Sequence, residues 1–326
     1  ELEITTMNLK NLILLGLFYV SFHSIAQDPT FTQFYSNPVY LNPALAGSSG
    51  CPRIALNYRN QWPQLTGNFI TYAAAYDTYA KNLSGGVGIM AMHDQQGQGT
   101  IQTSMIAGTY SYYLKVNRKF RIMFGGQAAY FQKYLDWNKL TFGDMIDPRR
   151  GFIYQTGDVP RGNGSHGFFD VSAGMVGFTK NFYFGVAAHH LNRPDESMIL
   201  GDSRLPIRIT GHMGANIKLG QRGRYSSNTT LMPNVIYQYQ NGFQQFNIGA
   251  YLKYESFTIG AWYRNRDAFI VSLGITTEKF RIGYSYDLTV SQLGGVSGGS
   301  HEISMGINLK CKKQMKDFRR ISCPSF

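Results

Sequence analysis

The chain has 326 residues, is rich in glycine and aromatic residues (36 Gly, 22 Tyr and 22 Phe), and carries a formal net charge of +12, yet its mean hydropathy is only -0.22. After residue 26 no uninterrupted apolar stretch is long enough for a transmembrane helix, which excludes a helical membrane protein. The basic charge alone would suit nucleic acid, anionic lipid or an acidic protein surface.

Residues 1–26 have the order of a secretory signal peptide. Lys10 supplies a positive charge, an apolar run covers residues 12–20, and a small-residue cleavage site ends at Ala26. The apolar run has about half the length that a helix needs to cross a bilayer. We therefore expect cleavage after Ala26, with residues 1–6 as a misplaced start or a cloning remnant; the alternative is a retained N-terminal helix. Export makes nucleic acid an unsuitable partner.

Residues 27–51 are dense in proline, asparagine and aromatic side chains. Such a composition is typical of turns and irregular backbone, and it disfavours a regular strand. We expect an extended lead-in to the first strand.

The rest of the chain repeatedly alternates with a period of two. From Ile207 to Leu219 the odd positions are apolar or small and the even positions mostly polar, and similar splits recur in 169–175, 246–253 and 302–310. Successive side chains of a strand point to opposite faces, so each segment has one apolar and one polar face. Many segments have about ten residues, the length that a tilted strand needs to cross a membrane. A soluble barrel would bury its apolar face; here we expect that face to meet lipid and the polar face to line a wet lumen.

Fourteen strands are expected, at 52–61, 66–79, 84–94, 100–116, 120–133, 168–179, 182–191, 206–218, 229–240, 244–254, 257–264, 268–276, 280–287 and 300–310. An even number is typical of a closed outer-membrane barrel made by one chain. The predicted fold is therefore all-β, a transmembrane antiparallel outer-membrane β-barrel over residues 52–310.

Connection lengths support this topology independently. Outer-membrane barrels pair short periplasmic turns with longer external loops. If the first strand starts in the periplasm, the three longest connections, 134–167, 192–205 and 288–299, all face outward. The opposite turns are mostly tight, with residues 219–228 as the exception.

The longest connection is a candidate partner-binding site. Its charged residues include Asp144, Asp147, Arg149 and Arg150. Connections of this length are uncommon and tend to be functional or disordered. The alternative is a solvated loop whose charges keep it soluble.

Residues 311–326 form a basic C-terminal tail, which after fourteen strands emerges in the periplasm. Its candidate partner-binding residues are Lys312, Lys313, Lys316, Arg319 and Arg320. A polybasic segment there would suit an acidic partner, and a solvated tail without a partner is the alternative.

Catalytic, metal and cofactor sites are not predicted. His189 and His190 are adjacent, so on a strand they would point to opposite faces and could not easily share a metal. The glycine-rich stretches 85–88 and 294–299 neither open a helix nor carry the lysine of a phosphate loop. No local signature links a serine or cysteine nucleophile to a base. We therefore expect no enzyme and no cofactor.

Several tracts together resemble a known family. They are Asp-Pro-Thr-Phe-Thr-Gln-Phe-Tyr at 28–35, Tyr-Leu-Asn-Pro-Ala-Leu-Ala-Gly at 40–47, Cys-Pro-Arg at 51–53, Asn-Tyr-Arg-Asn-Gln-Trp-Pro at 57–63 and the closing Cys-Pro-Ser-Phe. The chain resembles the PorP/SprF family of Bacteroidetes outer-membrane proteins, which is associated with the type IX secretion system. The similarity runs from the lead-in to the last residue.

The resemblance implies a role in the secretion or cell-surface anchoring of exported proteins, in some members of a large adhesin for gliding motility. The implied partners are a secreted protein substrate or adhesin, periplasmic or outer-membrane components of the secretion system, and outer-membrane lipid, but no nucleic acid. The strand pattern alone would equally allow a passive channel or a small-molecule transporter. The lead-in and the basic tail favour partner binding, because a simple pore needs neither.

Three cysteines are present, Cys51, Cys311 and Cys323. An exported location is oxidising and favours pairing. Cys51 precedes the first expected strand and Cys311 follows the last, and in a closed barrel these strands are neighbours about 4.8 Å apart. Their Cα atoms then fall within the roughly 4.4–6.8 Å that a disulfide needs. The predicted bond is Cys51–Cys311; the alternatives are Cys311–Cys323, Cys51–Cys323 and three free thiols.

Overall fold

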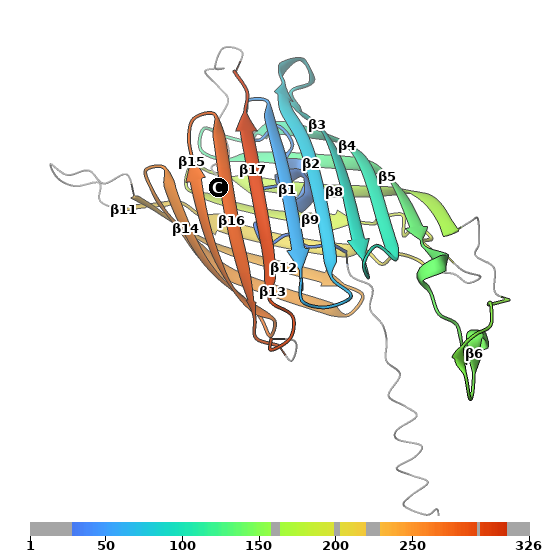
Figure 1. Cartoon of the computed structure of the whole chain (residues 1–326). Coiled ribbons are helices and arrows are strands. Elements are labelled where there is room, and N and C mark those ends of the chain that lie inside the picture. Colours follow the sequence, from blue (N-terminus) through green and yellow to red (C-terminus); the bar gives the residue numbers. More distant parts are fainter. Residues whose placement is uncertain (1–27, 158–163, 199–202, 220–228, 292–293, 312–326) are drawn as a thin grey trace, which may run out of the picture.

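The computed structural model describes residues 28–157, 164–198, 203–219, 229–291 and 294–311 (Figure 1). The predicted signal peptide and the basic tail from Lys312 onward lie outside these residues. No helix in the described ranges is long and apolar enough to cross a membrane.

Antiparallel strands form a closed barrel that crosses the membrane fourteen times. The strands are β1 Arg53–Gln61, β2 Phe69–Ala80, β3 Gly85–Gln96, β4 Ile101–Lys115, β5 Arg121–Leu135, β8 Ser165–Phe178, β9 Phe182–His189, β10 Arg208–Ala215, β11 Ile217–Leu219, β12 Thr229–Gln240, β13 Phe243–Tyr254, β14 Phe257–Arg264, β15 Ala268–Thr276, β16 Phe280–Thr289 and β17 Ser300–Asn308. β10 and β11 form one pass interrupted at Asn216, and both pair with β12. β1 pairs with β17 and closes the ring. The predicted fold is confirmed.

The alternation of the sequence separates the two faces of this wall. On β13 the side chain of Ile248 is 47% exposed, whereas that of its neighbour Asn247 is fully buried in the interior. β4, where the sequence alternates less regularly, still buries Thr109 and exposes Tyr110. The apolar side chains therefore face outward along the wall, as predicted.

The two ends of the barrel differ in their connections, and we name them accordingly. The long-loop end holds the connections 136–164, 190–207 and 290–299, while the short-turn end holds tight turns such as 255–256 and 277–279. Cys51 and Cys311 lie at the short-turn end and form a disulfide with a Cα–Cα distance of 5.0 Å. This is the pairing that the barrel topology favours.

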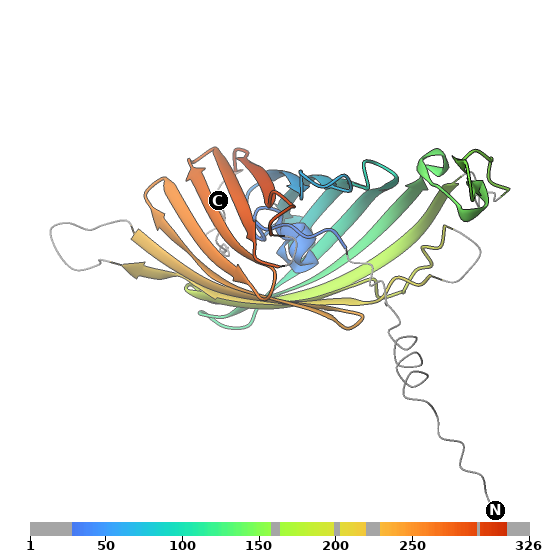
Figure 2. The same cartoon turned by 60° about the horizontal axis from the view of Figure 1, so that its bottom comes forward.

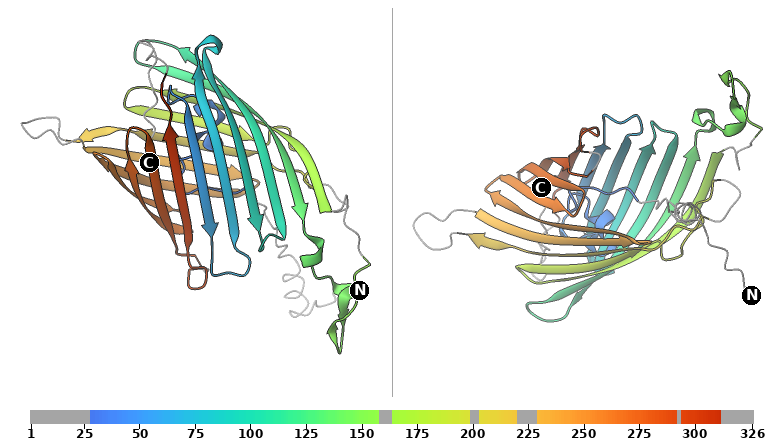
Figure 3. Two further views of the ribbon diagram at one scale, coloured as in Figure 1. Left: turned by 45° about the horizontal axis from the view of Figure 1, so that its top comes forward. Right: turned by 90° about the horizontal axis from the view of Figure 1, so that it is seen from below.

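Residues 28–50 form a plug inside the barrel, as Figures 2 and 3 show in blue. The plug contains the short helix α2 (Pro38–Leu41) and the 3-10 turn η1 (Pro43–Leu45). The prediction of an extended lead-in was therefore wrong. Proline at the start of both turns pre-sets a helical φ, and the Asn42 side chain accepts a hydrogen bond from the amide of Ala44 at 2.9 Å. The wet lumen predicted from the polar strand faces is instead occupied by protein.

Glycines in the wall give the plug its seat. A Cβ at Gly125 of β5 would lie 2.2 Å from the amide nitrogen of Ala44, and one at Gly86 of β3 would lie 2.1 Å from the carbonyl oxygen of Ala46. The plug backbone thus approaches the wall more closely than any side chain would permit. Gly126, which faces outward next to Gly125, has no atom within 4 Å of its ideal Cβ.

The loop between β5 and β8 projects from the barrel at the lower right of Figure 1. It contains the 3-10 turns η3 (Trp137–Lys139) and η4 (Gly143–Met145) and a small hairpin of β6 (Ile146–Asp147) and β7 (Gly151–Phe152). The remaining short element, η2 (Lys81–Leu83), forms the turn between β2 and β3. The projecting loop is the largest described feature outside the wall and the plug.

Candidate functional site

The centre of the plug is held by a buried carboxylate, Glu302 of β17. Its two oxygens accept hydrogen bonds from the amides of Thr32 at 2.5 Å and Gln33 at 3.1 Å. The Thr32 hydroxyl donates to Asp287 of β16 at 2.9 Å. Arg59 of β1 lies between the two carboxylates, 3.0 Å from Asp287 and 3.4 Å from Glu302. Three wall strands around the seam therefore fix the plug by charge-assisted bonds, which are stronger than neutral ones.

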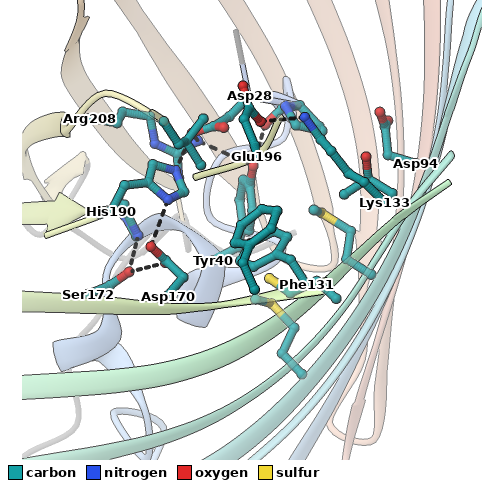
Figure 4. A pocket seen from close by; sticks show the side chains of 18 of the residues that line it. Asp28, Tyr40, Asp94, Phe131, Lys133, Asp170, Ser172, His190, Glu196 and Arg208 are labelled. Atoms are coloured by element: carbon teal, nitrogen blue, oxygen red, sulfur yellow. Dashed lines mark hydrogen bonds and ion pairs between the residues drawn. The ribbon is translucent and has the colours of Figure 1, made fainter. Parts of the chain in front are cut away.

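The first described residue of the plug, Asp28, joins a second buried network near the long-loop end. One oxygen of Asp28 lies 2.7 Å from Nε2 of His190 and 3.1 Å from Nη1 of Arg208. Nδ1 of His190 lies 3.0 Å from a carboxylate oxygen of Asp170 on β8 (Figure 4). The plug is thus anchored at its beginning to β8, to β10 and to the residue that follows β9.

Burial and neighbouring charges shift the pKa values of His190 and Asp28 in opposite directions. Burial disfavours the charged imidazolium, but the carboxylates of Asp28 and Asp170 outweigh it and raise the pKa of His190 to about 9. Burial likewise opposes the Asp28 carboxylate, yet His190 and Arg208 together lower its pKa well below the ordinary value. At neutral pH His190 is therefore a cation that pairs with the Asp28 carboxylate.

The position of His190 corrects an expectation from the sequence. β9 ends at His189, and His190 has a φ of 60°, so the chain turns there and both imidazoles are buried inside the barrel. They do not lie on opposite faces. The part of the chain that the structure describes holds no group of three or more potential metal ligands. An asparagine or glycine would have indicated this left-handed turn in the sequence, and a histidine does not.

A cavity of about 210 Å³ lies beside this network, toward the long-loop end (Figure 4). Methionine and phenylalanine side chains of β3, β4, β5 and β8 form much of its wall: Met90, Met92, Met105, Phe131 and Phe168. Asp94 of β3 also lines it and is held by Thr71 at 2.6 Å and Gln96 at 2.9 Å, while Lys133 forms an ion pair with Glu196. The cavity can hold an amphiphilic group.

The arrangement around this cavity does not form a hydrolytic triad. The Ser172 hydroxyl lies 3.2 Å from Nδ1 of His189, but the nearby carboxylate of Asp170 contacts Ser172 and His190 instead of orienting His189. A base in such a triad needs a third group that fixes its ring. The geometry suits binding better than hydrolysis.

The candidate residues of the long loop are only partly free for a partner. Asp144 accepts bonds from the Thr156 hydroxyl at 2.9 Å and the Gly157 amide at 2.8 Å, and Asp147 accepts from the amides of Arg149 and Arg150 at 2.8 Å. These backbone bonds lower the pKa of both aspartates. The carboxylates therefore shape the loop, while the side chains of the two arginines are exposed. The candidates Lys312, Lys313, Lys316, Arg319 and Arg320 lie outside the described residues.

The model of the PorP/SprF family, described as a type IX secretion system membrane protein, matches residues 23–307. The chain belongs to this family. The PorP/SprF match spans the plug and the barrel up to residue 307. The protein is thus an outer-membrane barrel of the type IX secretion system.

Solved outer-membrane proteins are similar to this PorP/SprF barrel at low identity. Omp33 of Acinetobacter baumannii is 9% identical, with 80% of this chain and 100% of that chain covered and a TM-score of 0.43. A FadL homologue of Pseudomonas aeruginosa is 12% identical, covering 86% and 99%, with a TM-score of 0.43. The KdgM porin is 8% identical, covering 79% and 99%, with a TM-score of 0.38. No functional conclusion follows at this level of similarity, and no curated protein matches the sequence.

Proposed function

We propose that the barrel binds, anchors or helps to export a protein secreted by the type IX secretion system, and that it acts as a docking body and not as an open conduit. The observation that carries this proposal is the plug. Residues 28–50 occupy the lumen and are bonded to the wall at Asp28, at Thr32 and Gln33, and at Gly47. A lumen used for diffusion would not need three separate anchors.

The surface offered to a secreted partner is the long-loop end. The folded loop 136–157 projects there, and the amphiphilic cavity lies on the same side of the plug. A defined loop with exposed arginines loses less conformational entropy on binding than a mobile one. The basic tail, on the opposite side in the predicted topology, would serve periplasmic components of the machinery.

The central test is capture of partners from outer membranes with a tagged full-length chain. Replacing residues 143–157 by a short Gly-Ser linker should abolish co-purification of the secreted protein, while heat-modifiable migration on gels shows that the barrel still assembles. The double variant Arg149→Gln, Arg150→Gln should weaken capture, and Arg266→Gln at the same end should leave it unchanged. Undiminished capture by the linker variant would refute the role of the loop.

External protease provides a second readout in intact cells. Cleavage within residues 136–157 should be rapid when the partner is absent and slower when it is present. Equal cleavage in both cases would argue against contact.

The alternative, a passive channel, has its own test. The native protein in planar bilayers should show no stable conductance, whereas a variant lacking residues 28–46 should conduct. Steady ion flow through the native protein would favour the channel.

A further inference from the structure

A second cavity, of about 440 Å³, opens at the short-turn end and is separate from the cavity at the long-loop end. We call it the basic vestibule. The base of the plug and the ends of β1, β16 and β17 surround it, and the disulfided cysteines lie in its wall. Its cationic side chains are Arg53, Lys279, Arg281 and Lys310, against a single lining carboxylate, Glu278.

Among the residues that the structure describes, only one of these cations, Arg53, forms an ion pair. Arg53 donates to both oxygens of Asp77, at 2.9 and 2.8 Å, and Asp77 also accepts the amide of Gly47 at 2.8 Å. Arg53 and Asp77 thus satisfy each other, and Asp77 also holds the base of the plug through Gly47. Counting Asp77, the vestibule has four cations and two carboxylates, so it keeps an excess of positive charge.

Among the other three cations, Arg281 is the buried one. Arg281 is only 9% exposed, and its buried Nε has no hydrogen-bond partner among the described residues. No hydrogen bond or ion pair joins it to any residue that the structure describes. The guanidinium lies over Gly306 of β17, where an added Cβ would come within 3.0 Å of Nη2. The wall thus makes room for a guanidinium that none of the described residues pairs with.

A buried guanidinium without an anion is costly, and native proteins pair such groups. Arginine presents its donors in a planar fork that matches the two oxygens of a carboxylate or phosphate. Arg281 lies on the inner face of β16, whereas its neighbours Phe280 and Ile282 are exposed on the outer face, so the wall separates Arg281 from lipid. A lipid headgroup on the outer face of the wall therefore does not reach Arg281, while a peptide entering the mouth of the barrel does.

We propose that the basic vestibule is an anion site in which Arg281 binds a carboxylate side chain from an acidic segment of a partner protein. The identity of the partner as a periplasmic component rests on the proposed function, but the site itself does not. Lys279 and Lys310 also line the vestibule, so its positive charge extends beyond a single contact. An acidic stretch several residues long is the complementary ligand.

Purified full-length protein in detergent tests the site directly. A fluorescent hexaglutamate peptide, followed by anisotropy, should bind the native chain, and Arg281→Gln should weaken binding at least tenfold. Arg266→Gln removes the same charge at the exposed long-loop end and should leave affinity unchanged. Equal affinities for Arg281→Gln and the native chain would overturn the proposal.

Phenylglyoxal modification of the native protein avoids any question of folding. Hexaglutamate should protect Arg281, and not Arg266, as measured by peptide mass spectrometry. Absence of protection would overturn the proposal even if Arg281→Gln fails to assemble. Protection by phosphate alone at equal concentration would indicate a small-anion site, and Arg281-dependent binding to phosphatidylglycerol vesicles a lipid site; either result refutes the acidic-segment assignment.

Deleting residues 312–326 distinguishes a partner from the chain's own end. Binding of hexaglutamate should fall or stay the same, because the deletion removes cations. An increase would mean that the tail competes for the vestibule, which would overturn the assignment to a partner. Because these measurements use purified protein alone, their failure would leave the docking function untouched, and a failed partner capture would leave the site standing.

Discussion

Ile248 and Asn247 are neighbours in β13, and the barrel wall separates their environments. Ile248 lies on the outer face, where any apolar side chain of similar size would serve. Asn247 is fully buried inside and accepts a hydrogen bond from Arg264 at 3.2 Å, and Arg264 in turn contacts Asp287 at 3.1 Å. The outer face is thus specified by polarity alone, and the inner face by particular partners.

Gly125 and Gly126 of β5 show the same difference between the inner and the outer face. Gly126 faces outward into open space, while Gly125 faces the plug, with backbone atoms of Pro43 and Ala44 within 2.5 Å of its ideal Cβ. One glycine tolerates a side chain and the other does not. The plug, and not the wall, therefore determines which side chains the inner face can accept.

The largest loss of stability is expected from removing the disulfide of Cys51, which lies between the plug and β1. Replacing Cys51 and Cys311 by serine should lower the free energy of unfolding by up to about 5 kcal/mol, because the bond closes a very long loop. Denaturant titration in detergent, with and without reductant, measures this change. Cys323→Ser is the control and should have no effect. Non-reducing peptide mapping should link Cys51 to Cys311, and a crosslink from Cys323 would contradict the assignment.

The next effect tests the outer face. Ile248→Arg places a charge near the middle of the lipid-facing side and should cost roughly 2–4 kcal/mol. Tyr254→Arg, at the end of the same strand, should cost about 1 kcal/mol or less, because the penalty falls toward the interface. Equal costs would mean that the strand is placed wrongly in the membrane. Asn247→Arg, on the inner face, would crowd Arg264 and is not a suitable mild control.

A smaller effect is expected on the inner face at the plug seat. Gly125→Ala should destabilise the protein by about 1–3 kcal/mol, the usual range for overpacking, or displace the plug and open a conductance in planar bilayers. Gly126→Ala should be neutral or slightly stabilising, because glycine weakens strands. Similar behaviour of the two variants would show that the plug does not press on β5.

The outer face and the topology could be predicted from the sequence, because a period of two and the sorting of loop lengths depend on local order alone. The bounds of strands such as β12 and β14 agree with the prediction to the residue. The plug could not be predicted, because its prolines and asparagines fit irregular backbone equally well inside or outside a barrel. Its buried apolar residues, Phe34 and Leu45 among them, were the available signal.

The inner sites were missed for a related reason. Arg281, Glu302 and Asp28 are single charged residues in polar strand faces or in the lead-in, and nothing in the chain indicates that they meet protein and not water. The partner of Glu302 at Thr32 lies 270 residues away in the sequence. Only the closure of the barrel brings such residues together.

The smallest effect we predict is a pH-dependent loosening of the plug at Asp28. The pKa of His190 is raised to about 9. The stabilisation that His190 gives to the anchor is therefore complete below its ordinary pKa of about 6.5 and is lost as pH rises through about 9. Because the pKa of Asp28 is lowered, its contribution is complete above about 4 and is lost as pH falls. The carboxylate of Asp170, the cation of Arg208 and the ring of His189 also face this group. The anchor should therefore be firmest between about pH 4 and 6.5.

Oxidative footprinting of buried Phe31, three residues after Asp28, measures this loosening without unfolding the barrel. Its modification should rise severalfold between pH 6 and pH 10 in the native chain. His190→Gln removes the titrating group and should give high modification at both values, whereas His301→Gln, which is remote from Asp28 in the sequence and lies beside Tyr284, should retain the native profile. A flat profile for the native chain would show that the anchors at Thr32 and Gln33 and at Gly47 hold the plug without help from the Asp28 network.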